Sequence, residues 1–169
     1  MKKTISIALS KESLNQAEKL LNQYIQEHNQ AVNTAIKTAT EAMYEKVMQY
    51  CYENNIVEHT DRIFMEYDPI NNIGKVWSDD AVIIFNEMGT GIVGSNNPHP
   101  NPLIEWKYDI NEHGEKGWKY PKGDGTFGWT KGLPSRHMFY SAFEDIKDKI
   151  GDIVNVTLSQ TGGWIYGDR

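Results

Sequence analysis

Histidine and carboxylate side chains are the first residues in this sequence that could do chemistry, because together they can hold a metal ion. Four of the five histidines lie in the region that is rich in glycine and proline or just before it, and Asp109 or Glu112 could complete a site. They are His59, His99, His113 and His137. No pair of them follows the His-x-x-x-His or His-Glu-x-x-His spacing that places ligands on one helix face, and their spacings match no standard zinc pattern. We therefore expect no metal site and no cofactor.

Nucleophilic and acid–base chemistry has few candidates. The single cysteine, Cys51, lies in a helical pattern, where a small buried hydrophobic role is expected. The sequence has no Gly-x-Ser-x-Gly elbow and no phosphate-binding loop. Glu87, beside Phe85, is the one carboxylate within an apolar run, so it is either an acid whose pKa burial raises or a hydrogen-bond anchor for a turn. We expect the chain not to be an enzyme.

Three tryptophans at similar spacing, Trp106, Trp118 and Trp129, suggest a further possibility. Aromatic rings on a β-ribbon could stack against sugars, with Asp109 or Glu112 as an acid, which would make the chain a carbohydrate-binding or carbohydrate-processing module. The other interpretation is that the rings pack a thin sheet that has little other core.

Composition limits the remaining classes. The 169 residues are 39% hydrophobic and 24% charged, as expected for a single globular domain over residues 1–169, with two small lobes as the alternative. The net charge of −6 argues against a general nucleic-acid binder, which needs a basic face. No apolar run approaches the ~20 residues of a membrane span, so we expect a soluble protein made in a reducing cytoplasm.

The elements that would position these residues begin with a long helix. Residues 11–53 contain no glycine and no proline, follow Ser10 as a candidate cap, and carry apolar residues at spacings of three and four. The stripe comprises Leu14, Ala17, Leu21, Tyr24, His28, Val32, Ala35, Ala39, Met43, Val47 and Cys51. A helix of this length reaches ~60 Å, so it either breaks near Asn29 or Asn33 or projects one end onto a neighbouring subunit.

Short β-type segments follow the helix. We expect strands at 62–67, 74–78 and 81–87, and the last of them runs into the turn Gly89-Thr90-Gly91. Because the connections between these strands are short, we expect the strands to pair as an antiparallel meander. The proline-rich stretch 95–104 is expected to form an irregular loop. Strands are expected at 105–110, 117–121 and 126–131. Together, residues 95–131 form a loop and β-ribbon insertion.

A C-terminal helix is predicted to start at Pro134 and Ser135, with Phe139 and Phe143 buried against the sheet. Residues 153–158 suit either helix or strand, and residues 159–169 are expected to form a tail. The predicted fold is α+β: a long N-terminal helix packed on a small antiparallel sheet, with a tryptophan-rich β-ribbon insertion and a C-terminal helix.

The order of four segments resembles a known family. VIIFNEMGTGIVG, NPHP, WKYDINEHGEKGW and WTKGLPSRHMFYSAFEDIK, taken in this order, are similar to the tail-component family of long-tailed bacteriophages. The resemblance covers roughly residues 10–150. The acidic-glycine turn (Glu87, Gly89, Thr90, Gly91) and the segment from Pro134 to Phe143 carry it, and His137 departs from the residues common at its position.

This resemblance implies a structural virion protein at the head–tail junction, active in neck or tail completion and without catalytic residues. Its implied partners are further copies of itself in a ring of six, the head connector or stopper, and tail terminator or tail-tube proteins. DNA would pass without sequence-specific binding, which a negative lumen would help. The Glu87–Gly91 turn, the tryptophan ribbon and the projecting end of the helix are then the expected assembly surfaces.

Overall fold

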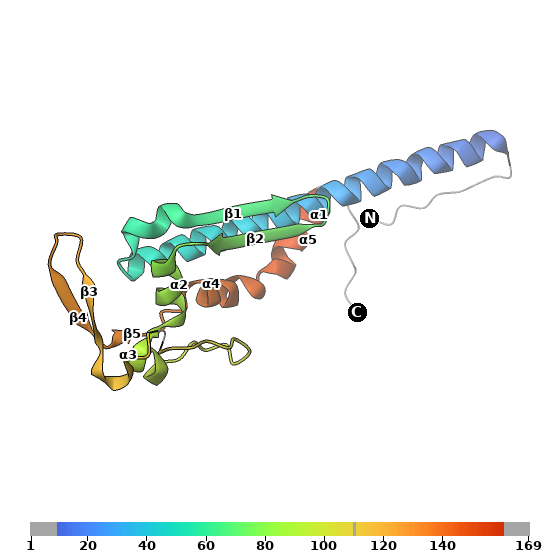
Figure 1. Ribbon diagram of the computed structural model, residues 1–169. Helices are drawn as coiled ribbons and strands as arrows, with labels where there is room; N and C mark the ends of the chain where they lie inside the picture. The colour runs from blue at the N-terminus through green and yellow to red at the C-terminus, as the bar shows by residue number, and fades with distance from the viewer. Residues whose placement is uncertain (1–9, 110, 161–169) are drawn as a thin grey trace. The chain divides into compact units, whose positions relative to one another are not determined.

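The computed structural model describes residues 10–109 and 111–160, and it confirms a mixed fold with a long N-terminal helix, small antiparallel sheets and C-terminal helical segments (Figure 1). The chain divides into two compact units. The first unit contains Met1–Ala42, Glu66–Lys75 and Ile146–Arg169, and the second contains Met43–Met65 and Val76–Asp145. The expectation of a single folding domain stays a prediction.

Helix α1 (Lys11–Glu53) is continuous, so no break occurs near Asn29 or Asn33. Ser10 caps its start, because the Ser10 Oγ accepts a hydrogen bond from the Ser13 amide at 3.2 Å. The helix ends at Glu53, and two residues later Asn55 takes a left-handed φ of 58° that lets the Ile56 amide bond the Cys51 carbonyl at 2.9 Å. This is a Schellman ending with asparagine in the place that glycine usually takes.

Strands β1 (Ile63–Asp68) and β2 (Ile73–Ser78) form the first hairpin, as the sequence predicts. Its turn is held by Asp68, whose Oδ1 accepts the Ile70 amide at 2.9 Å. In the first unit the hairpin lies close against α1 at Gly74, where a Cβ atom would collide with the Thr40 side chain. Thr40 is fixed there because its hydroxyl donates to the Ile36 carbonyl at 2.7 Å.

The expected strand at 81–87 is wrong: residues Ala81–Met88 form helix α2, followed by α3 (Gly91–Asn96). Asp80 decides this, because its Oδ1 accepts the amides of Val82 and Ile83 at 2.7 and 3.1 Å and so caps a helix. An apolar run this short has no period that separates a buried strand from a buried helix. The glycine turn therefore connects two helices rather than ending a strand.

The ribbon contains β3 (Trp118–Pro121) and β4 (Phe127–Thr130), which pair antiparallel as expected. The expected strand at 105–110 is absent: over residues 105–109 the chain has no regular element, and residue 110 lies outside the described part. A short strand, β5 (Gly132–Leu133), follows the ribbon and bridges to Thr90 and Gly91. The 3-10 turns Val57–Arg62 and Gly114–Lys116 complete this region.

The C-terminal helices are α4 (Met138–Lys147) and α5 (Ile150–Gln160). Helix α4 begins later than Pro134 and Ser135, because the amides of Arg136 and His137 bond the carbonyls of Asn86 and Glu87 instead of opening a helix. Residues 153–158, left open by the sequence, are helical. Of the predicted tail, residues 159 and 160 end α5 and the remainder lies outside the described residues.

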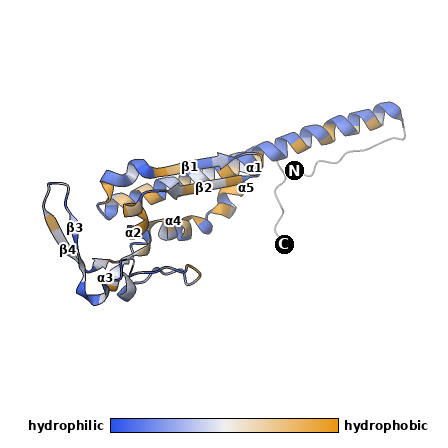
Figure 2. Ribbon diagram, viewed as in Figure 1, coloured by the Kyte–Doolittle hydropathy of each residue, from blue (hydrophilic) through white to orange (hydrophobic). Residues whose placement is uncertain are grey.

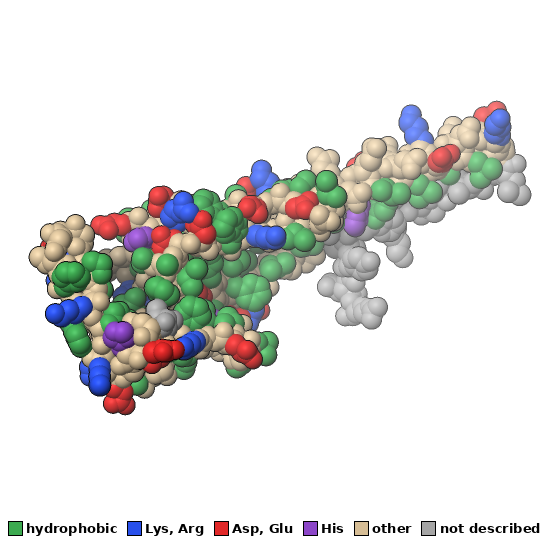
Figure 3. All heavy atoms as spheres, in the orientation of Figure 1, with side chains coloured by type: hydrophobic (Ala, Val, Ile, Leu, Met, Phe, Trp, Pro, Cys, Tyr) green, Lys and Arg blue, Asp and Glu red, His purple; other side chains and the backbone are tan. Residues whose placement is uncertain are grey.

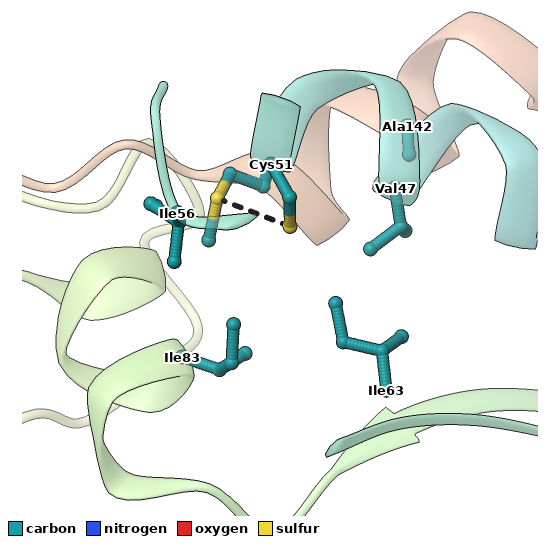
Figure 4. Packing of buried hydrophobic residues seen from close by; sticks show 7 residues of the cluster. Val47, Cys51, Ile56, Ile63, Ile83 and Ala142 are labelled. Carbon is teal, nitrogen blue, oxygen red and sulfur yellow. Dashed lines mark hydrogen bonds between the residues drawn. The ribbon is translucent and has the colours of Figure 1, made fainter. Parts of the chain in front are cut away.

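The hydrophobic core of the second unit gathers α1, β1, α2 and α4 (Figures 2 and 4). Its buried residues are Val47, Cys51, Ile56, Ile63, Ile83, Met138 and Ala142. Burial, followed by the charge of Glu87, raises the pKa of the Cys51 thiol to about 11. Phe139 packs against this core, but the predicted burial of Phe143 is wrong, since Phe143 is 48% exposed. The buried residues of α4 are Met138, Ala142 and Ile146, which recur every four positions, and Phe143 lies outside this stripe.

The Gly74 contact predicts a coupled pair. We expect Gly74→Ala to lower the free energy of unfolding by roughly 1–3 kcal/mol because the added methyl overpacks the hairpin against Thr40. Adding Thr40→Ala should recover part of that loss. Urea denaturation of both single variants and the double variant measures the coupling. Gly123→Ala is the control, since nothing lies within 4 Å of its Cβ position. If the change in unfolding free energy of the double variant equals the sum of the changes of the two single variants, the contact between Gly74 and Thr40 is contradicted.

The Asp80 cap predicts a pH-dependent contribution to stability. Burial acts to raise the pKa of Asp80, but hydrogen bonds from Ile83, His59 and Val82 outweigh it, and the pKa is lowered. A lowered pKa means stability that is present above the unfolded value near 4 and lost as pH falls through the folded value. Asp80→Ala should cost about 1 kcal/mol at pH 7.

The difference between Asp80→Ala and the unsubstituted protein should then shrink as the pH is lowered below 4, as measured by urea denaturation at each pH. Asp148→Ala, at an exposed position, is the control and should show little difference at any pH. If the difference in unfolding free energy between Asp80→Ala and the unsubstituted protein stays constant down to the lowest pH measured, the charge of Asp80 contributes nothing to stability.

Candidate assembly site

The Glu87 carboxylate, in the last turn of α2, lies at the N-terminal end of α4. Its Oε2 accepts the Phe139 amide at 2.8 Å and its Oε1 accepts the Tyr140 amide at 3.0 Å. These are amides of the first helical turn, which have no partner within the helix, and the helix dipole favours a negative charge there. Glu87 therefore caps a helix that begins about 50 residues further along the chain.

His99 is the third partner of this carboxylate. Its Nε2 lies 3.2 Å from Glu87 Oε1, and its Nδ1 accepts the Asn101 amide at 3.2 Å. An acceptor at Nδ1 places the ring proton on Nε2, which then donates to Glu87. The His99 amide donates to the Tyr108 hydroxyl at 3.0 Å, and the ring lies edge-on to Tyr140. The loop after α3 is thereby fixed to the junction of α2 and α4.

The glycine turn completes this junction at close range. Gly89 and Gly91 have φ values of 80° and 60°, which favour glycine, and a Cβ on Gly91 would meet the Lys131 carbonyl and the Trp118 ring. Between them, Thr90 Oγ1 accepts the Leu133 amide at 3.1 Å. The backbone oxygen of Gly89 accepts the indole N–H of Trp106 at 2.8 Å.

The structure thus brings together most of the residues that the sequence singled out. Pro134 joins them through its neighbours, since Leu133 bonds Thr90 and the Ser135 hydroxyl donates to the Glu87 carbonyl at 2.6 Å. The expected assembly role of the turn stays a prediction. Gly89, Thr90 and Gly91 are buried, so the turn is a scaffold and not a free surface.

Trp129 lies apart from that scaffold, on the ribbon. In the β3–β4 register Lys119 pairs with Trp129 and Trp118 pairs with Thr130, so the two tryptophans point to opposite faces. Trp118 is half-buried near His113, whereas Trp129 is 60% exposed. The three tryptophans therefore do not form one stacking face, and no contact favours the carbohydrate hypothesis.

Phe127 shares the outward face of the ribbon with Trp129, because residues two apart on a strand point to the same side. Phe127 is 68% exposed. The opposite face is closed by Tyr120, which covers Gly128 so closely that a Cβ there would collide with its ring. The ribbon thus presents two adjacent exposed aromatic side chains on one face, and the single Tyr120, 41% exposed, on the other.

The other candidate residues do not converge. Each of the four candidate histidines has a separate partner: His59 the carboxylate of Asp80, His99 that of Glu87, His113 the carbonyl of Asn111, and His137 the hydroxyl of Ser141. Asp109 accepts the Gly114 amide through Oδ2, and the exposed Glu112 pairs with Lys107. Within residues 10–109 and 111–160, no three His, Cys, Asp or Glu side chains come together as a metal site.

Sequence reasoning missed the residues that bond Glu87. His99 was considered only as a metal ligand, and Ser135 only as a helix start. The usable signal was Asp80, whose capping position would have identified α2 and placed Glu87 in its last turn.

No helix in the described part of the chain is both long and apolar enough to cross a membrane. Comparison of the sequence with family models and with curated proteins, and of the structure with solved structures, finds no match.

Removing the Glu87 cap tests the scaffold. Glu87→Ala leaves two helix amides and His99 without their acceptor, and hydrogen bonds to charged groups contribute roughly 1.5–3 kcal/mol each to stability. We expect Glu87→Ala to lower the free energy of unfolding by at least that amount in a urea titration, and Glu87→Gln to lose less because one carbonyl oxygen remains. Glu105→Ala, at an exposed position, is the control. A loss no larger than that of the control would mean that the cap does not stabilise α4.

Proposed function

We propose that this chain is a structural subunit of a bacteriophage particle, which forms a ring at the head–tail junction and completes the neck or tail. The observation that carries this proposal is the exposed aromatic pair Phe127 and Trp129 on one face of the β-ribbon. The order of sequence motifs that resemble a phage tail-component family supports it independently.

The aromatic pair is what a protein-binding surface requires. Aromatic residues, tryptophan above all, are enriched at the centres of protein–protein interfaces, where a few side chains contribute most of the binding energy. A two-stranded ribbon also has open edges that can pair with another chain. The Phe127 and Trp129 face therefore fits a contact with a neighbouring protein in an assembly, such as a head connector, stopper, tail terminator or tail-tube protein.

The scaffold below the ribbon gives this surface a fixed base. Trp118, the first residue of β3, contacts the buried glycine turn, and Leu133, just after β4, bonds Thr90. Both strands are thus anchored in the junction that Glu87 holds together. An interface that is already ordered before binding loses less conformational entropy on assembly, which raises affinity.

The charge balance suits a channel protein. The net charge of −6 favours repulsion of DNA phosphates, so DNA could pass through a ring of this chain without being held. A ring also needs contacts between unlike surfaces that close, because open contacts of this kind grow into filaments. Six copies are the expected number.

The ribbon face can be tested in the phage or prophage that encodes the chain. We expect Phe127→Ser with Trp129→Ser to leave the melting temperature of the purified protein nearly unchanged, because both side chains are exposed. The same double variant should prevent joining, so that electron microscopy of lysates shows separate heads and tails. Lys119→Ala, on the same face without an aromatic ring, is the control and should give complete virions.

Two results would contradict the proposal. Normal virions from the double variant would remove the ribbon face as an assembly surface. A reconstruction of the neck that shows no density for this chain, or only one copy, would remove the ring at the head–tail junction.

A further inference from the structure

The N-terminal part of α1 contains a seven-residue repeat. Residues 14–20, 21–27 and 28–34 read LNQAEKL, LNQYIQE and HNQAVNT, with Asn-Gln at the second and third position each time. With the first residue of each repeat as heptad position a, the a positions are Leu14, Leu21 and His28, and the d positions are Ala17, Tyr24 and Ala31. Alternating spacings of three and four are the pattern of helices that coil around one another.

The period changes further along the same helix. From Ala35 the apolar residues recur every four positions, through Ala39, Met43 and Val47 to Cys51. Val47 and Cys51 belong to the core of the second unit, so this part of α1 packs against its own chain. A 3.5-residue period keeps a seam directed at a partner helix, which a four-residue period does not. The two parts of α1 are therefore built for different neighbours.

The heptad part carries large apolar side chains at positions a, e and g that its own chain leaves accessible, whereas the small d residues Ala17 and Ala31 are buried. Apolar side chains gather along one side of this part of α1 (Figure 3). The exposed fractions are 51% for Leu14, 49% for Leu20, 51% for Leu21 and 53% for Ile25. Leu20 occupies position g and Ile25 position e, one on each flank of the seam. An apolar seam with apolar residues on both flanks is wider than a simple two-helix seam.

The polar face of this segment argues against a membrane or a nucleic acid as the occupant. Its b and c positions are all amides: Asn15, Gln16, Asn22, Gln23, Asn29 and Gln30. Helices that lie on membranes instead carry many lysines and arginines on the polar face. Only Lys11 and Lys19 are basic between residues 11 and 30, against three glutamates, so nucleic acid is also a poor partner.

A second copy of the chain fits the flanks. In parallel helices position g of one helix faces position e, five residues on, of the next. This places Leu20 against Ile25 of the neighbour, Ser13 against Glu18 and Glu27 against Val32, so apolar meets apolar and no like charges meet. Copies related by a rotation axis that runs along the helices present parallel helices, and with three or more copies each has a neighbour on both flanks.

We propose that residues 11–30 of α1 pack in parallel against the same segment of the two neighbouring copies, with Leu20 of each copy against Ile25 of the next. The cyclic arrangement rests on the proposed ring function. The heptad repeat and the accessible leucines are independent of it.

Engineered cysteines test this contact directly. Natural Cys51 is buried and its thiol has a pKa of about 11, so it stays unreactive in the native protein at neutral pH. We would prepare the full chain as Leu20→Cys with Ile25→Cys, and each single variant, and oxidise them at roughly 1 mM, a concentration comparable with that within an assembly. Gln16→Cys with Gln23→Cys, both on the polar face, is the matched control.

We expect the double variant to give a ladder of disulfide-linked oligomers that ends at one closed size on a denaturing gel. The single variants and the control should remain monomers. A second measurement uses no cysteine: Leu20→Glu with Ile25→Glu should lower the sedimentation mass at the same concentration, while circular dichroism shows an unchanged helix content.

Dimers without a ladder would show a two-fold pair and overturn the two-neighbour arrangement, and no cross-linking would overturn the contact itself. A neck reconstruction separates these results from the proposed function. Density for the chain in the neck without a ladder would mean that the ring forms through other surfaces. A ladder without neck density would mean self-association of the chain outside any neck.

Discussion

The second unit depends most on the hydrogen bonds that the Glu87 carboxylate accepts. This carboxylate lies largely out of solvent, where an ionised group needs several hydrogen bonds, and it receives them from two amides of α4 and from His99. The same residue's carbonyl accepts the Ser135 hydroxyl and the His137 amide. One residue thus fixes where α4 begins, how it meets α2, and where the loop after α3 runs.

Close backbone packing extends this junction to the ribbon. Gly91 has no side chain, so Lys131 and Trp118 can approach it and β5 can bridge to the turn. The Gly89-Thr90-Gly91 motif looks like a surface turn in the sequence, but in the structure it is the buried contact that anchors the ends of β3 and β4. The aromatic residues divide accordingly: Trp106 and Trp118 contact this motif, while Phe127 and Trp129 face solvent on the strands themselves.

Helix α1 combines two periodicities, and each suits a different task. Where the apolar spacing is four, Val47 and Cys51 are buried with residues of β1, α2 and α4 in the core of the second unit. Where the spacing alternates between three and four, leucine and isoleucine side chains remain half-exposed. The d residues Ala17 and Ala31 of the heptad part, and Ala35 after it, are also buried. In the heptad part the chain therefore covers small residues and leaves the large ones half-exposed.

Local signals in the sequence determined the elements whose patterns are long or whose ends are capped. Residues 11–53 lack glycine and proline and start at a serine cap, and the first hairpin turns at an aspartate that bonds its own backbone, so both were predictable. Only the tertiary structure decided the rest, because it depends on contacts between distant residues. The partners of Glu87 lie up to 53 residues away, and the start of α4 is set by amides that bond carbonyls of α2. Burial of Ala142 rather than Phe143 depends on which face of α4 meets the core.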